Sequence, residues 1–69
     1  MGNHVYKQIV ITGTSKVSIE DAVNSALAKA AESVRNLRWL EITGTRGHIE
    51  NQKLLHWQVT MTVGFTLED

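Results

Sequence analysis

Four side chains in the second half of the chain have the chemistry to bind a flat, polar ligand: Trp39, Arg46, His56 and Gln58. An indole offers a π-face, and a primary amide offers a donor beside an acceptor, which matches the edge of a planar heterocycle. An arginine next to a glycine offers a positive charge to a phosphate or an electron-rich ring. An ordinary hydrated sheet face explains the same residues, and the residue types alone favour this plainer interpretation.

Catalytic and metal-binding patterns are not visible in the sequence. The serines fall in a predicted turn, at a helix cap and on the helix, with no histidine beside them in the pattern. Glu41 and Glu50 do not form a recognisable acid–base pair, and Gly13-Thr-Ser is too short for a phosphate-binding loop. The three histidines lack metal-ligand spacing and the chain has no cysteine. We therefore expect neither an enzyme nor a metal site.

Length and charge narrow the possible partners. The 69 residues predict one domain, residues 1–69, and the seven basic and seven acidic side chains cancel. We expect no nucleic-acid or membrane-surface binding driven by charge, and no apolar stretch approaches the roughly 20 residues of a membrane span. The absence of cysteines and of a signal-peptide pattern predicts a cytoplasmic location. A core this small is marginal alone, which favours a homo-oligomer.

The first half of the chain predicts a strand followed by a helix. Residues 5–12 are rich in β-branched and aromatic types, and Gly13-Thr-Ser indicates a turn after them. Ser18 is a good helix N-cap. Apolar residues then recur at three- and four-residue steps, which predicts one amphipathic helix over residues 19–36 that stops at Asn36.

Two further strands are predicted over residues 38–47 and 52–67. Residues 47–52 indicate a hairpin connection, with Asn51 as its turn residue. Strict alternation separates Trp39 from the apolar side chains of its strand and places it on the more polar face, with Glu41, Thr43 and Thr45. A core role and a stacking role both stay open for Trp39.

The last strand is too long for the helix to cover. Its apolar residues alternate from Leu55 to Leu67, which predicts a half-buried strand. Residues 52–67 would span about 50 Å as a straight strand, against about 27 Å for the helix. We expect the strand to bend, at Gly64, and its end to pack on another subunit. The element order predicts an α+β fold, β-α-β-β, in which a three-stranded antiparallel sheet with the last strand in its centre partly wraps around one helix.

Four motifs, taken together, resemble the dodecin family. They are Gly-Thr-Ser at 13–15, Leu-Arg-Trp-Leu-Glu-Ile at 37–42, Thr-Arg-Gly-His at 45–48 and Trp-Gln-Val-Thr-Met-Thr-Val-Gly-Phe-Thr-Leu-Glu at 57–68. The resemblance covers nearly the whole chain without an evident insertion. It implies the same β-α-β-β fold, assembly into a hollow homododecamer, and pairs of flavins stacked at subunit interfaces between tryptophans of symmetry-related chains.

The resemblance also implies roles for individual residues. The stacking tryptophan of the family falls on Trp39, the glutamine that hydrogen-bonds the flavin pyrimidine edge falls on Gln58, and the interface arginine falls on Arg46. The implied function is non-catalytic binding and storage of flavin with photoprotective quenching, and FMN is the expected ligand ahead of riboflavin or FAD. An assembly protein whose interface pocket binds another planar ligand, such as coenzyme A, is the alternative.

Two residues depart from the family pattern. Arg38 stands directly before Trp39, where many members carry an aspartate, so we expect it to alter polar contacts to the flavin. Thr66 stands where bacterial members often carry an arginine, which puts coenzyme A binding in doubt.

Overall fold

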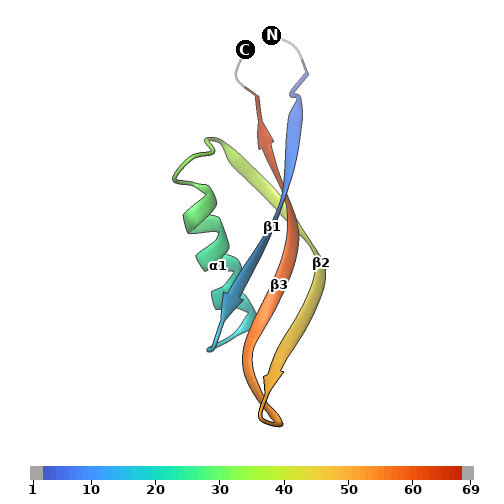
Figure 1. Cartoon of the computed structure of the whole chain (residues 1–69). Helices are drawn as coiled ribbons and strands as arrows, with labels where there is room; N and C mark the ends of the chain where they lie inside the picture. The colour runs from blue at the N-terminus through green and yellow to red at the C-terminus, as the bar shows by residue number, and fades with distance from the viewer. Residues whose placement is uncertain (1–2, 68–69) are drawn as a thin grey trace.

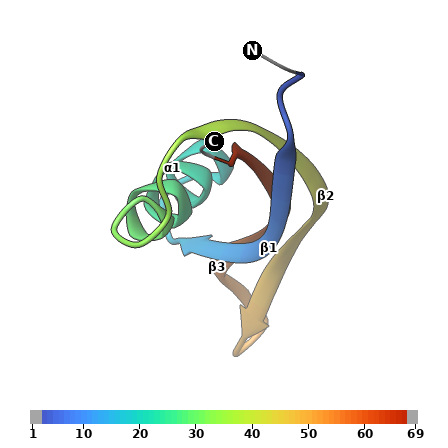
Figure 2. The ribbon, with the colours of Figure 1, turned by 90° about the horizontal axis from the view of Figure 1, so that it is seen from above.

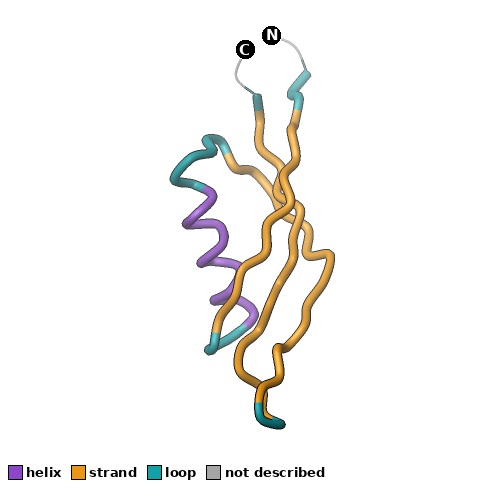
Figure 3. Tube along the Cα trace, viewed as in Figure 1, coloured by secondary structure: helices purple, strands orange, loops and turns teal. Residues whose placement is uncertain are grey.

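The computed structural model describes residues 3–67, which form three strands and one helix (Figure 1). In chain order these are β1 (Tyr6–Ser15), α1 (Ile19–Ala30), β2 (Leu37–Glu50) and β3 (Lys53–Thr66). The order in the sheet is β1-β3-β2, and β3 pairs antiparallel with both neighbours (Figure 3). The predicted α+β fold, with the last strand in the centre, is confirmed.

The sheet is much longer than the helix that covers it. The chain extends 55 × 20 × 14 Å, with a Cα radius of gyration of 14.4 Å, against about 11 Å for a compact chain of this length. Seen from above, the strands curve partly around α1 (Figure 2). Strand β3 stays paired on both sides at Gly64 and curves along its length, in place of the bend that we predicted at that residue.

Helix α1 is shorter than predicted. Ser18 is its N-cap, as expected, and the Ser18 hydroxyl accepts a hydrogen bond from the Asp21 amide at 3.0 Å. The helix ends at Ala30, six residues before the predicted stop at Asn36, because the chain tightens into a turn in which the Ser33 amide donates to the Ala30 carbonyl at 3.1 Å. Asn36 does take a positive φ of 64°, but it ends the connecting loop and not the helix. The 12-residue helix is therefore about 18 Å long.

Strand β1 continues through the segment that we assigned to a turn. Gly13 and Ser15 both remain paired with β3. Gly13 lets the strand approach the helix closely, because a Cβ at this position would meet the Ala22 carbonyl oxygen and lie 2.9 Å from the Cβ of Ala26. Ser15 is buried and its hydroxyl donates to the Asp21 carboxylate at 2.6 Å, which ties the end of β1 to the first turn of α1.

The β2–β3 hairpin has a two-residue turn. Asn51 and Gln52 connect the strands with φ values of 54° and 66°, the left-handed conformation at both central positions that matches the twist of paired strands. The prediction of Asn51 as the turn residue is confirmed, but the predicted six-residue connection is wrong. Because the turn is this short, β2 extends to Glu50 and is longer than the predicted strand over residues 38–47.

Strand β2 contains an extra residue at Thr43. Ile42 pairs with Met61 and Gly44 pairs with Thr60, so two steps on β2 correspond to one step on β3. Thr43 therefore has no partner of its own in the register, which is the definition of a β-bulge. Its hydroxyl donates to the Thr60 carbonyl oxygen at 3.3 Å.

The bulge exchanges the two faces of β2. Beyond it, Thr45 pairs with the buried Val59 and Arg46 pairs with Gln58. Cross-strand partners share a face of the sheet, so Thr45 lies on the helix side. Strict alternation placed Thr45 on the same face as Trp39, and this prediction is wrong. Arg46 lies on the outer face instead.

The hydrophobic core lies where α1 crosses the middle of the sheet. Its buried apolar side chains are two from the helix and three from β3: Ala22, Ala26, Val59, Met61 and Val63. Large apolar side chains elsewhere stay exposed, among them Val10 at 69% and Ile49 at 68%. Within residues 3–67 there is no helix long and apolar enough to cross a membrane.

Candidate functional site

Trp39 lies on the outer face of the sheet, over the backbone of β3. It follows the extra residue Arg38 and pairs with Gly64. The indole occupies the space above this glycine, since a Cβ on Gly64 would meet ring atoms Cε2 and Cζ2 and would lie 2.7 Å from Nε1. Tyr6 contacts the indole from β1, with ring centroids 6.2 Å apart and an interplanar angle of 62°. Trp39 is nevertheless 38% exposed, so its ring is supported by the sheet but is not part of the core.

Arg46 and Gln58 are direct partners on the same face, nearer the hairpin end. Gln58 is half-buried, and its Nε2 lies 3.3 Å from Nε2 of His56. The next pair on this face, His48 and His56, stacks with ring centroids 5.1 Å apart and an interplanar angle of 16°. The structure thus brings three of the sequence-predicted residues, Arg46, His56 and Gln58, into one polar group.

Trp39 does not join this polar group within one chain. Its partner Gly64 and the Arg46 partner Gln58 are separated by six residues on β3, which corresponds to about 20 Å along a strand. The intervening outer face carries threonines, of which Thr12 and Thr60 share a hydrogen bond of 3.0 Å between their hydroxyls. A planar ligand that contacts both Trp39 and Gln58 cannot do so on a single chain, because it would have to span this distance.

Arg38 occupies a different position from the other predicted residues. As the extra residue between Leu37 and Trp39 it has no partner in the strand register, and its side chain is exposed. It borders a pocket beside Trp39 at the edge of the sheet. The other residues that line this pocket are Leu27, Leu37, Leu40 and Val63. Arg38 is thus placed to contact a group bound next to Trp39.

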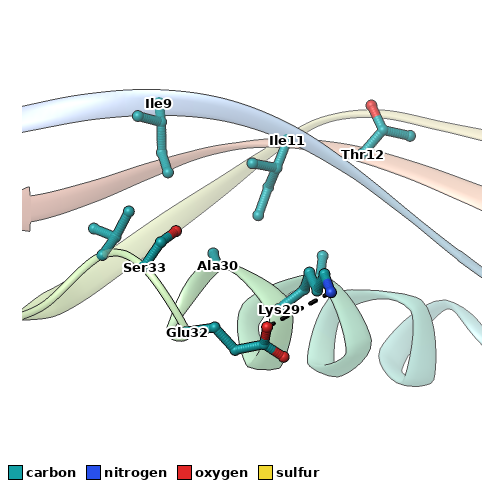
Figure 4. A pocket seen from close by; sticks show the side chains of 9 residues that line it. Ile9, Ile11, Thr12, Lys29, Ala30, Glu32 and Ser33 are labelled. Atoms are coloured by element: carbon teal, nitrogen blue, oxygen red, sulfur yellow. Dashed lines mark ion pairs between the residues drawn. The ribbon is translucent and has the colours of Figure 1, made fainter.

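A second, larger pocket lies between β1 and the end of α1 (Figure 4). Its walls are mostly aliphatic, with Ile9 and Ile11 on the strand and Ala30 on the helix. At its rim the Lys29 ammonium pairs with the Glu32 carboxylate at 3.5 Å. Among residues 3–67 no group of three or more histidine, cysteine, aspartate or glutamate side chains could hold a metal ion.

Sequence reasoning overlooked Tyr6 and Gly64. Tyr6 belongs to the first predicted strand, but its neighbours across the sheet depend on the strand register, which the sequence does not give. Gly64 did carry a signal, because a glycine inside an alternating strand marks a place where another group approaches the backbone closely. The group that approaches is the indole of Trp39.

Comparison with known proteins agrees with this architecture. The family model described as Dodecin matches residues 5–68. A dodecin of Thermus thermophilus is 40% identical over 65 residues, which cover 94% of each chain. The structure of a dodecin from Streptomyces davaonensis superposes with a TM-score of 0.93 at 37% identity, covering 99% of this chain and 100% of the other.

A more distant relative extends the comparison. The crystal structure of a calcium dodecin from Mycobacterium tuberculosis, described as having a novel calcium-binding site, superposes with a TM-score of 0.82 at 28% identity. The match covers 93% of this chain and 91% of the other. The profile match over nearly the whole chain, together with 40% identity to a curated member, shows that this protein belongs to the dodecin family of small flavin-binding proteins.

Proposed function

We propose that this protein binds and stores flavin, with FMN as the ligand, at interfaces between the chains of a homododecamer. Trp39 stacks on the isoalloxazine ring, Gln58 of another chain hydrogen-bonds the pyrimidine edge, and Arg46 supplies positive charge beside it. The protein acts as a binding protein and not as an enzyme, in the cytoplasm. Riboflavin and FAD present the same ring system and are alternative ligands.

The observation that carries this proposal is the position of Trp39. The indole rests over a glycine on the outer face, outside the core of its own chain, and stays 38% exposed. Such a ring is available as a platform for a planar ligand, and aromatic platforms contribute about 1–3 kcal/mol for each stacked base in comparable sites.

The distance between Trp39 and Gln58 supports a site that two chains build together. The two residues share a face but lie about 20 Å apart on one chain. The expected ligand is a single planar ring system that has to reach both. An interface that brings Trp39 of one chain close to the Arg46–Gln58 pair of another satisfies this requirement.

The shape of the chain supports assembly. Among residues 3–67, eleven large apolar residues are exposed, and the chain is extended beyond the size of a compact domain. Such surfaces are typical of chains whose stability depends on partner subunits. Light scattering should therefore give a mass near twelve times 7.7 kDa, and a folded monomer at micromolar concentration would contradict the proposal.

Stacking on Trp39 also provides the photoprotective part of the proposed function. An electron passes from the indole to the photoexcited flavin and then returns, so the excitation energy is lost without chemistry. A flavin enclosed between aromatic rings also has little room for oxygen or for a substrate, which favours storage over catalysis.

Two other ligands are less well supported. Coenzyme A would need the charge that bacterial members often place where this chain has Thr66, a half-buried residue that pairs with Tyr6. Calcium is bound by a relative, but no acidic group of the required size is found among residues 3–67. We therefore retain another planar ligand only as the outcome to be expected if flavin does not bind.

The test is flavin binding by the purified protein and three variants. An absorbance scan with mass spectrometry of the released ligand identifies the flavin. Trp39→Ala should keep its fold and assembly but lose flavin and its quenching, and Gln58→Ala should weaken binding by about 1–3 kcal/mol. Trp57→Ala is the control, because Trp57 lies half-buried on the helix side and its loss should reduce thermal stability first. Normal binding and quenching by the Trp39 variant would exclude this role.

A further inference from the structure

We propose that Gly64 and Tyr6 are positioning residues that hold the Trp39 indole in the orientation required for ligand stacking. This inference rests on the proposed function, because it assumes that Trp39 stacks on flavin. It also makes a statement about the ligand-free protein that can be tested alone.

Gly64 forms the floor under the indole. Trp39 and Gly64 are direct partners on β2 and β3, and ring atoms occupy the space that a Cβ on Gly64 would need. The backbone of β3 therefore lies directly against the ring. Any larger residue at this position would lift the indole away from the sheet.

Tyr6 restrains the indole from the side. It lies at the start of β1, on the far side of β3 from Trp39, and pairs with Thr66. Its ring meets the indole in an edge-to-face arrangement, with centroids 6.2 Å apart and planes inclined at 62°, a geometry that aromatic pairs favour. Two different strands thus contact Trp39, one from below and one from the side.

These contacts matter because Trp39 is otherwise weakly held. It lies on an edge strand, follows a bulge and is 38% exposed. A free side chain must lose rotamer freedom when a ligand stacks on it, and a ring that is already fixed avoids that cost. Gly64 and Tyr6 therefore raise affinity without touching the ligand.

Gly64→Ala tests the floor. The three atoms nearest to the added methyl group all belong to the Trp39 side chain, so we expect the indole to move while the strands stay paired. Gly44→Ala is the matched control, because Gly44 lies on the same face and a Cβ there meets nothing within 4 Å. We expect Gly64→Ala to weaken flavin binding about tenfold or more, which is the loss of most of one stacking contact, and Gly44→Ala to bind normally.

Tyr6→Ala and Tyr6→Phe test the side contact. Alanine removes the ring and should weaken flavin binding several-fold, whereas phenylalanine keeps the edge-to-face contact and should bind as the wild type does. If Tyr6→Phe lost as much affinity as Tyr6→Ala, the hydroxyl and not the ring would be responsible, and the positioning role of the ring would be wrong.

The near-ultraviolet circular dichroism of the flavin-free protein provides the independent measurement. A fixed Tyr6–Trp39 pair gives a coupled aromatic signal, which Gly64→Ala and Tyr6→Ala should reduce and Gly44→Ala and Tyr6→Phe should preserve. If the wild type binds no flavin but this pattern is found, the proposed function fails and the positioning of Trp39 stands. Unchanged dichroism and unchanged flavin affinity in both Gly64→Ala and Tyr6→Ala would overturn the inference.

Discussion

Mixed assemblies of two defective chains should regain flavin binding. One chain carries Trp39→Ala and the other Gln58→Ala, and each alone forms assemblies in which every site lacks one of the two contacts. The residues lie about 20 Å apart on one chain, so a flavin that touches both must draw them from different chains. Random assembly of equal amounts then gives about a quarter of the sites an intact Trp39 and an intact Gln58, as expected for an interface built from two different surfaces.

The assay is fluorescence titration with FMN at concentrations that saturate wild-type sites but not variant sites. Two different affinity tags, purified in sequence, verify that the assemblies contain both chains. A second mixture, of wild type with the Trp39→Ala/Gln58→Ala double variant, separates the models further: sites shared between chains keep about a quarter of the binding, and sites within one chain keep about half. Verified mixed assemblies of the two single variants without any high-affinity sites would refute the composite site.

Two predictions concern stability. Met61→Ala should lower the free energy of unfolding by about 2–5 kcal/mol, because Met61 is fully buried in the small core. Val10 is 69% exposed, so thermal melts should show a much smaller shift in melting temperature for Val10→Ala. Equal shifts for the two variants would mean that the core lies elsewhere. Gln52→Gly should stabilise the chain by about 0.5–1 kcal/mol. Gln52 adopts a left-handed φ of 66°, and glycine takes this conformation without strain. The expected gain is the strain removed minus the cost of the greater freedom of glycine in the unfolded state. A lower melting temperature for Gln52→Gly would show that the Gln52 side chain makes a stabilising contact.

Local patterns were enough to predict the elements and their order. The β-branched residues of β1, the helical period after Ser18 and the alternation in β3 each agree with the element that forms. The central place of β3 was predicted from its length, although β2 proves to be equally long, with 14 residues in each strand. These features depend on residues close together in the chain, which is why the sequence specifies them.

The errors occurred where tertiary contacts override local preference. Residues 31–36 continue the helical period, but the chain has to turn back there to begin β2. Gly13 resembled a turn residue, although its role is to let β1 approach the helix. Thr43 is a β-branched residue typical of any strand, so nothing local revealed that it is an extra residue.

Prediction of the candidate site was limited in the same way. The family resemblance identified Trp39, Arg46 and Gln58, and the structure brings Arg46 and Gln58 together as cross-strand partners. Alternation alone would have put Arg46 on the face opposite Trp39. The distance from Trp39 to this pair could not be predicted without the register, and the arrangement of neighbouring chains lies beyond the sequence of one.

The bulge at Thr43 determines which side chains of β2 lie on the outer face of the sheet. If β2 paired with β3 residue for residue through Thr43, without the bulge, Thr45 would lie opposite Gln58 and Arg46 would lie opposite Trp57, on the helix side. The bulge, and not the order of residues alone, therefore decides which side chains of β2 form the outer face. A relative can retain all the motif residues at the same spacing and still present a different outer face if its strand lacks the bulge.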